Sequence, residues 1–293
     1  MKLAQAIEEN IVTRIGIMPY NTGSKSAKEL AAHLGEHTKC KVRIIKTDGN
    51  YKATPGTVLI NWGYSQRPAN RSLVPAFTDT AQINLNGKGF NLPGRVALAT
   101  NKRETFITFD REDVPKPEST AMPEQAARWI QDGHNVVARH VLNSHSGRGI
   151  VVAGPNGTLY ADPKYANTEF FSARLFTKYV KKTHEYRVFV VGGQVVFCYE
   201  KKRDLEAQDR QFFVRTHATG WNFAKVENTD VPAGVLVAAV KAVSALGLHF
   251  GAVDIGWHSP TKTAVVFEVN TAPGITGGSV PRFADGLLNN LEV

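Results

Sequence analysis

Two apolar segments near the end of the sequence constrain the fold most, because they predict a strand pair with polar side chains on one face. Val265 to Val269 is an apolar, β-branched run, and Ala252 to Trp257 reads as a neighbouring strand. The turn-rich segment between them favours antiparallel pairing. Side chains alternate between the two faces of a strand, so Glu268 and Asn270 point the same way. Antiparallel pairing is then expected to bring Asp254 close to both.

These three side chains form a candidate cation site. Mg²⁺ prefers carboxylate oxygens together with substrate phosphates, so Asp254, Glu268 and Asn270 predict a magnesium site. Ordinary solvent-facing strand residues would give the same pattern, because short motifs also match by chance. From these residues alone both interpretations stay open.

The composition indicates a soluble globular protein. The chain has 293 residues, enough for one large domain or two to three small ones, with 42% hydrophobic and 21% charged residues. No segment approaches the run of ~18 apolar residues that spans a membrane. The first ten residues lack the apolar stretch of a secretory signal, and Cys40 and Cys198 are isolated. We therefore expect a cytoplasmic protein without a disulfide framework or a membrane partner.

The net charge of +9 and the isoelectric point of about 9.5 favour anionic partners, which include nucleotides, acidic substrates and nucleic acid. The positive residues are spread out, with short runs only at Lys181-Lys182 and Lys201-Lys202-Arg203. A solvated basic surface explains them better than a DNA-binding groove. No motif in the sequence supports nucleic-acid binding.

Strand and helix signals alternate in the first part of the chain. Arg14 to Met18, Val42 to Ile45 and Val58 to Asn61 are apolar and predict strands. Ser26 to Glu29 fits a capping box that opens a helix ending near Gly35. This order at this spacing predicts a small parallel α/β sheet.

The segment from Asn101 to Thr120 is expected to be a boundary, because its proline-rich part cannot continue a helix. The elements predicted beyond it are a helix from Pro123 to Gly133, strands at Asn135 to Val141, Ile150 to Ala153, Leu175 to Val180, Tyr186 to Val191 and Gln194 to Tyr199, a Gly192-Gly193 hairpin turn, and a helix from Val231 to Leu246. The Gly/Ser-rich turn from Asn143 to Gly149 could offer backbone N–H groups to phosphates, although most such hairpins are only turns.

Several charged residues suit a bound nucleotide. Arg139 lies on an apolar strand just before the Gly/Ser-rich turn, where a guanidinium could contact phosphates. Glu185 and Arg187 share one strand face, so they could meet ribose and phosphate, or simply form a cross-strand ion pair. Arg215 lies in a polar stretch and could stabilise charge during phosphoryl transfer.

The order of these features resembles the ATP-grasp superfamily, and within it the RimK-like carboxylate–amine ligases, over about residues 95 to 280. Glu185-Tyr186-Arg187 and the hairpin after it are similar to the family's acid-x-Arg strand. The resemblance implies a nucleotide-binding set of Lys102, Arg139, Ser146, Gly147, Gly149, Lys178, Tyr179, Val180, Glu185 and Arg187, the catalytic arginines Arg187 and Arg215, and the metal ligands Asp254, Glu268 and Asn270. The family usually has a lysine at the position of Arg139, and often an asparagine near Thr216 and His217.

The resemblance implies an α/β and α+β fold, in which a small N-terminal α/β domain precedes a two-lobed ATP-grasp fold. The expected domains are the N-terminal domain at 1–100, the first lobe at 101–175, and the second lobe with the metal site at 176–293. The implied enzyme is an ADP-forming acid–amino-acid or peptide ligase. It would use ATP and Mg²⁺, with Mn²⁺ as an alternative metal, to join a carboxylate to an amine through an acyl phosphate.

Two other functions stay open from the sequence. A non-catalytic nucleotide- or polyanion-binding protein on the same fold would explain the charge and the arginine at 139. A basic DNA-binding protein without nucleotide would bind in a salt-dependent way that ignores Mg²⁺. The sequence does not name the carboxylate or the amine, although the positive charge favours an acidic peptide or protein as substrate.

Overall fold

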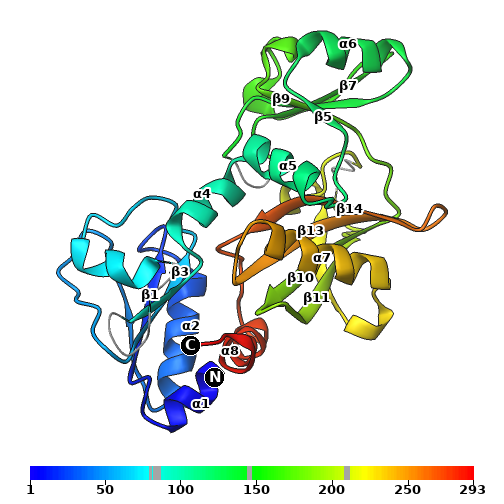
Figure 1. Cartoon of the computed structure of the whole chain (residues 1–293). Helices are drawn as coiled ribbons and strands as arrows, with labels where there is room; N and C mark the ends of the chain where they lie inside the picture. The colour runs from blue at the N-terminus through cyan, green and yellow to red at the C-terminus, as the bar shows by residue number, and fades with distance from the viewer. Residues whose placement is uncertain (79–80, 82–86, 144–146, 208–211) are drawn as a thin grey trace.

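The structure is a computed structural model that describes residues 1–78, 81, 87–143, 147–207 and 212–293. It contains three β-sheets, which follow one another along the chain (Figure 1). The first sheet lies apart from the other two, and the last helix packs between the first and third sheets. Among the described residues, no helix is both long enough and apolar enough to cross a membrane.

The N-terminal sheet is parallel, as predicted, with strand order β2-β1-β3-β4. Its elements are α1 (Leu3–Glu8), β1 (Arg14–Pro19), α2 (Lys25–His37), β2 (Lys41–Ile44), β3 (Thr57–Trp62) and β4 (Lys88–Phe90). The central strand β3 is buried along its whole length, and β1 is buried from Ile15 onward. A central parallel strand is covered on both faces, which explains why these two strands are nearly continuous apolar runs.

The start of α2 differs from the prediction. The N-cap is Ser24, whose hydroxyl accepts a hydrogen bond from the backbone N–H of Ala27, so the predicted capping box at Ser26 is wrong. Glu29 forms an ion pair with Lys25 one turn earlier instead of reaching back to a cap. The hydroxyl of Ser26 accepts from the backbone N–H of Ile275 at 3.1 Å, which ties the N-terminal sheet to the end of the chain.

Two helices meet at the start of the segment expected to be a boundary, the first ending just before it and the second lying within it. These are α4 (Pro93–Thr100) and α5 (Lys102–Arg111). The side-chain oxygen of Asn101 caps α5 by accepting hydrogen bonds from the backbone N–H groups of Arg103 and Glu104. Phe106 and Phe109 of α5 are fully buried against the third sheet. The cap and the spacing of these two rings were the signals for this helix. The domain limits at residues 100 and 175 stay predictions.

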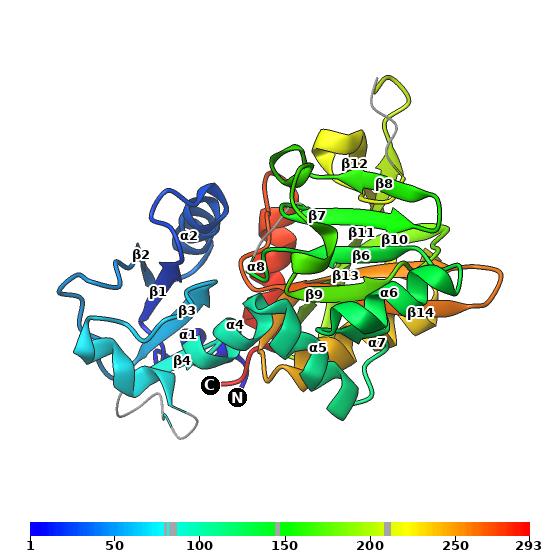
Figure 2. The ribbon, with the colours of Figure 1, turned by 90° about the horizontal axis from the view of Figure 1, so that it is seen from above.

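The middle sheet is antiparallel, in the order β5-β9-β6-β7-β8. Its elements are β5 (Ser119–Thr120), α6 (Pro123–Gln131), β6 (Val136–Arg139), β7 (Ile150–Gly154), β8 (Gly157–Ala161) and β9 (Leu175–Lys178). Trp129 of α6 packs with Phe176 and Ala138 to form a small core of its own. Figure 2 shows this sheet lying across the third sheet.

The third sheet is also antiparallel, in the order β12-β11-β10-β13-β14. Its elements are β10 (His184–Val191), β11 (Gln194–Arg203), β12 (Trp221–Val226), α7 (Ala233–Ala245), β13 (Phe250–His258), β14 (Thr263–Asn270) and α8 (Ser279–Asn290). Short 3₁₀ turns complete the described chain at η1 (Arg71–Phe77), η2 (Pro163–Tyr165), η3 (Phe170–Ser172), η4 (His217–Thr219) and η5 (Asn228–Asp230). The predicted turn at Gly192-Gly193 is confirmed, since both residues have positive φ.

The two faces of the third sheet bury different cores. Val188 and Val253 point toward α7, whereas Phe189 and Phe250 point toward α8 and the N-terminal sheet. The ring of Phe283 on α8 lies between the N-terminal sheet and the third sheet. Its centroid is 5.4 Å from that of Trp62 in β3 and 5.9 Å from that of Phe250 in β13. One apolar core therefore joins the first and last sheets.

We predict that Phe283→Ala destabilises the whole chain by about 3–5 kcal/mol, because it leaves a cavity where three rings meet. Urea denaturation monitored by circular dichroism measures this effect. Val237→Ala is the control, because Val237 lies on α7 with 66% of its surface exposed, and it is expected to change stability by less than about 0.5 kcal/mol. Equal stabilities of the two variants would contradict the shared core.

Candidate functional site

A cavity of about 1080 Å³ lies where the three sheets face one another. It is lined by residues from the middle and third sheets, by the start of α5, and by the loops that follow β1 and β3. Of the predicted site residues that the structure describes, all except Gly149 line this cavity. Ser146 lies outside the described residues.

The strand pair predicted from the sequence forms the floor of the cavity. β13 and β14 are antiparallel, and Asp254 lies directly opposite Glu268 in their register. The side-chain amide of Asn270 donates a hydrogen bond to Oε1 of Glu268 at 3.2 Å, so these two side chains share a face. The predicted convergence of the three side chains is confirmed, and their role as metal ligands stays a prediction.

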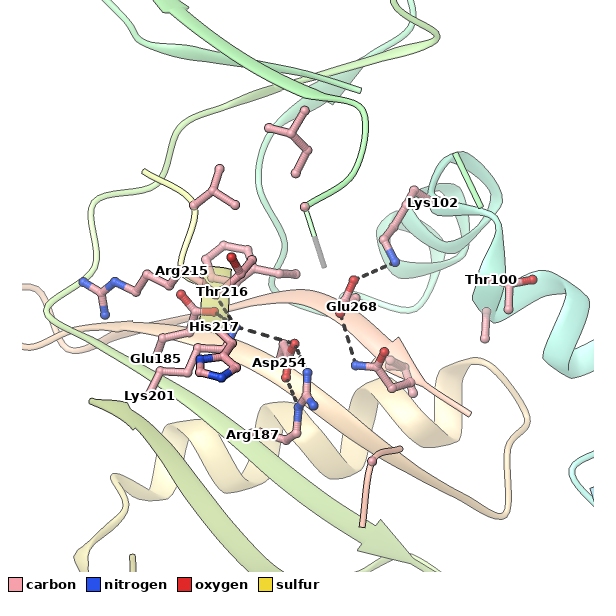
Figure 3. A pocket seen from close by; sticks show the side chains of 18 of the residues that line it. Thr100, Lys102, Glu185, Arg187, Lys201, Arg215, Thr216, His217, Asp254 and Glu268 are labelled. Carbon is pink, nitrogen blue, oxygen red and sulfur yellow. Dashed lines mark hydrogen bonds and ion pairs between the residues drawn. The ribbon is translucent and has the colours of Figure 1, made fainter. Parts of the chain in front are cut away.

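Arg187 holds Asp254 from the neighbouring strand. The two residues are register partners in the β10–β13 pair, and the guanidinium binds both carboxylate oxygens at 2.7 Å (Figure 3). Burial alone would lower the pKa of Arg187, but the charge and hydrogen bonds of Asp254 outweigh burial and raise it. Arg187 is therefore a permanent cation.

Lys102 holds Glu268 from a different element. It is the first residue of α5, its side chain is only 6% exposed, and its Nζ lies 2.9 Å from Oε2 of Glu268 (Figure 3). Burial alone would raise the pKa of Glu268, but the nearby cations Lys102 and Arg187 lower it below its usual range. Glu268 is therefore ionised at neutral pH.

Glu185 is surrounded by lysines. Its two oxygens lie 2.5 Å from Nζ of Lys201 and 3.4 Å from Nζ of Lys182. Burial would raise the pKa of Glu185, but the two lysine charges lower it. Lys201 also lies 3.9 Å from Asp254. Sequence reasoning did not select Lys201 or Lys182, which were seen only as members of short basic runs.

Two arginines of the cavity have buried nitrogen atoms without partners among the described residues. These atoms are Nε of Arg139 and Nε of Arg215. Burial lowers the pKa of both groups, while Glu268 and Glu185 respectively oppose that effect. Buried unsatisfied donors are uncommon in proteins, so these two N–H groups are candidates to donate to a further acceptor.

The charge of the cavity is unbalanced. Eight Lys and Arg residues line it against three Asp and Glu residues, so five positive charges are in excess. The lining cations are Lys25, Lys102, Arg139, Lys178, Lys182, Arg187, Lys201 and Arg215, and the acids are Glu185, Asp254 and Glu268. Such an excess inside a cavity attracts a ligand with several negative charges.

The predicted nucleotide-binding residues Lys178, Tyr179 and Val180 lie at and just beyond the end of β9. The backbone N–H groups of Lys178 and Tyr179 donate to the carbonyls of Glu118 and Asn135, at 2.9 and 2.7 Å. Both amides are therefore already used within the protein. The role of Val180 in nucleotide binding stays a prediction.

Gly147 and Gly149 of the predicted Gly/Ser-rich turn lie just before β7, and Gly147 lines the cavity. Gly147 and Gly149 have φ of 76° and 74°, a conformation that favours glycine. The backbone N–H of Gly149 donates to Oδ2 of Asp162 at 2.7 Å and does not face the cavity. Of these two glycines, only Gly147 remains near enough to meet a ligand.

The donors on the floor of the cavity fit a divalent cation. Two carboxylates and one amide offer hard oxygen ligands of the kind that Mg²⁺ prefers, with phosphate oxygens to complete the set. No cluster of three or more His, Cys, Asp or Glu residues suited to a metal occurs in the described ranges. A metal here would therefore depend on Asn270 and on its ligand's own oxygens.

Known proteins share part of the sequence or the fold of this chain. No family model matches the sequence. The tetrahydromethanopterin:alpha-L-glutamate ligase of Methanocaldococcus jannaschii is 26% identical over 218 residues, which is 69% of each chain. The ATP-grasp ligase PsnB complexed with minimal precursor has a TM-score of 0.63 at 15% identity, covering 94% of this chain and 98% of PsnB. The RimK domain ATP-grasp protein from Sphaerobacter thermophilus gives 0.57 at 13% identity, covering 94% and 98%.

This chain has the ATP-grasp fold. The fold class expected from the sequence is therefore confirmed, with a small parallel α/β sheet followed by two antiparallel sheets. The cavity lies where the two antiparallel sheets of the ATP-grasp fold face each other. The individual roles assigned to its side chains stay predictions.

We predict that Glu185→Gln destabilises the chain by about 3–5 kcal/mol near neutral pH, because two buried lysines lose their counter-ion. The folded-state pKa of Glu185 is lower than its unfolded value of about 4.3. The stabilisation by the charged form is therefore complete above about pH 4.3 and is lost as the pH falls through the folded-state pKa. Urea denaturation over a pH series measures the difference between wild type and variant.

Glu227→Gln is the matched control, because Glu227 forms an exposed ion pair with Lys225. Its expected effect is small at any pH, because water screens an exposed ion pair. A Glu185→Gln effect as small as this control, or one that grows as the pH falls, contradicts the proposed charge balance.

Proposed function

We propose that the chain is an ATP-dependent carboxylate–amine ligase that forms an amide through an acyl phosphate and releases ADP and phosphate. The observation that carries this proposal is the cavity's excess of cations, together with the buried Nε atoms of Arg139 and Arg215 that have no partner among the described residues. A triphosphate supplies the charge and the acceptor oxygens that these groups need. The ligases that share the fold support the same reaction class.

In the proposed reaction an oxygen of the substrate carboxylate attacks the γ-phosphorus, and the bond to the bridging oxygen of ADP breaks. The amine then attacks the acyl carbon, and phosphate leaves. Arg187 and Arg215 lie on opposite sides of the Glu185 and Lys201 pair and are the candidates to stabilise the charge that develops on the transferred group (Figure 3).

The other charged residues would bind and orient the nucleotide. Lys102 and Arg139 would contact phosphate oxygens, and Asp254, Glu268 and Asn270 would hold Mg²⁺ or Mn²⁺. A bound Mg²⁺ neutralises phosphate charge and keeps the reacting groups in line. Glu185 would accept hydrogen bonds from the ribose hydroxyls while it stays paired with Lys182 and Lys201. Another structure of PsnB, complexed with Mg and ADP, supports the choice of ligands.

The substrates would enter from the N-terminal side of the cavity, where the loops after β1 and β3 form the wall. Residues 1–100 contain thirteen Lys and Arg against six Asp and Glu, so they hold most of the net positive charge. An acidic peptide or protein is the substrate that this charge favours. The PsnB complex with minimal precursor supports a peptide. The reaction would take place in the cytoplasm.

A non-catalytic binding protein is the second candidate, favoured by the same excess of charge. It would bind ATP or another polyanion and produce no ADP. The two predictions below distinguish this candidate from the ligase.

We predict that ATP with Mg²⁺ raises the melting temperature of the wild-type protein, whereas Mg²⁺ alone does not. A ligand at ~100 times its dissociation constant adds about 2.7 kcal/mol of stability. Glu268→Gln is expected to lose most of the Mg²⁺-dependent part of this shift, and Glu227→Gln is expected to keep all of it. The absence of any ATP shift in the wild type contradicts the ligase and leaves a protein that binds another polyanion.

We predict that the wild type releases ADP in the presence of ATP, Mg²⁺, hydroxylamine and a pool of acidic peptides and amino acids. Hydroxylamine would trap the acyl phosphate as a hydroxamate, which is detected by mass spectrometry. Arg215→Met is expected to lower kcat by about 10²–10³, because it removes one group that faces the developing charge. Lys225→Met is the control, because its ion pair is exposed. ATP binding without ADP or hydroxamate from any acid supports the non-catalytic candidate.

A further inference from the structure

Every carboxylate oxygen on the cavity floor already faces a nitrogen donor. Arg187 donates hydrogen bonds to both oxygens of Asp254. Asn270 donates to Oε1 of Glu268, and the ammonium of Lys102 forms an ion pair with Oε2. These are the same oxygens that a divalent cation would need. In this arrangement the protein's own donors pair with the oxygens proposed for the metal (Figure 3).

The two cations differ in how they are held. Arg187 lies directly opposite Asp254 in the β10–β13 register, so backbone pairing keeps them adjacent. Lys102 belongs to α5, which reaches Glu268 only through the long lysine side chain. Lysine is a point charge on a flexible four-carbon stem. Lys102 can therefore leave Glu268 more readily than Arg187 can leave Asp254.

A metal ion and Lys102 compete for Glu268. Mg²⁺ binds carboxylate oxygens at about 2.0–2.1 Å, whereas the ammonium of Lys102 now lies 2.9 Å from Oε2. Two positive ions at one oxygen repel each other, and the low exposure of Glu268 weakens screening by water. The metal can occupy this oxygen only when Lys102 has another anion to bind.

A nucleotide phosphate is such an anion. Arg139 lines the same cavity as Lys102 and Glu268, and its buried Nε has no partner among the described residues, so the expected phosphate position lies in the cavity that these side chains share. We propose that Lys102 is a positioning residue that occupies the metal site on Glu268 and moves to the phosphates when nucleotide binds. This inference rests on the proposed function, and it makes metal binding dependent on nucleotide.

Metal binding without turnover tests the proposal. Mn²⁺ titrated into the nucleotide-free protein, followed by electron paramagnetic resonance of free Mn²⁺, is expected to show weak binding in the wild type. With ADP present, the affinity is expected to rise within the range of about 5–150-fold that is typical of coupling between ligands. Lys102→Met is expected to bind Mn²⁺ without nucleotide about tenfold or more tightly than the wild type.

Two variants serve as matched controls. Lys102→Arg keeps the cation and is expected to leave nucleotide-free Mn²⁺ binding weak. Lys25→Met removes one positive charge from the same cavity, but Lys25 is 78% exposed and pairs with Glu29, so its Mn²⁺ affinity is expected to match the wild type. Circular dichroism verifies folding, and Lys102→Gln replaces Lys102→Met if the latter does not fold.

The outcomes separate this inference from the proposed function. Nucleotide binding by the wild type together with an unchanged Mn²⁺ affinity in Lys102→Met and Lys102→Gln overturns the role of Lys102 and leaves the ligase proposal intact. Equal Mn²⁺ affinity of the wild type with and without ADP overturns it as well. Failure of the wild type to bind ADP or ATP under any condition overturns the proposed function and the inference together.

Discussion

The register of two strand pairings determines the chemistry of this chain. β10 pairs with β13 and β13 pairs with β14, so Arg187, Asp254 and Glu268 occupy three adjacent positions across the sheet. A shift of either pairing by one residue would turn the side chains to the opposite face, where α7 packs. The apolar residues that alternate with them, such as Val253 and Val269, prevent that shift because they must remain in the core.

The site is built from charges that destabilise one another. Moving an ion from water into a protein interior costs several kcal/mol even after relaxation, and the cavity contains more buried cations than acids. The close pairs of Glu185 with Lys201 and of Asp254 with Arg187 offset part of that cost. Lys25 and Lys178 pair with Glu29 and Glu118 outside the cavity, and the remaining cations exceed the acids that line it. Binding of a polyanion would offset this excess of positive charge. Ligand binding is therefore expected to increase the stability of the fold.

Strand alternation predicted that Glu268 and Asn270 share a face, but a register shift between Asp254 and Ile255 is what brings Asp254 opposite Glu268, since the turn alone would place Asp254 opposite Phe267. The sequence predicted Lys201 poorly for a physical reason. A two-residue turn at Gly192-Gly193 without irregularity would place Glu200 opposite Glu185. A register shift between Phe189 and Val190 moves the pairing by one residue and brings Lys201 toward Glu185. Such bulges depend on packing with neighbouring strands, and no local pattern in the sequence marks this one.

The remaining differences have local causes. Ser24 and Ser26 both suit a helix start, and the turn made when the N–H of Gly23 donates to the side chain of Asn21 favours the earlier one. The helices α4 and α5 share a single junction at Asn101, which reads in the sequence as one polar interruption. Lys102 follows that residue, so its place beside Glu268 depends on tertiary packing that the sequence pattern does not reveal.

The position of α8 also affects how the chain is synthesised. α2 packs against α8, and Leu30 and Phe283 belong to one core, yet nearly 190 residues separate the end of β4 from the start of α8. At about 5–20 residues per second, a ribosome needs roughly 10–40 s to cover that interval. During this time the first sheet has emerged but the apolar face of α2 lacks its cover. The nascent chain therefore exposes this apolar face until its last helix has been made.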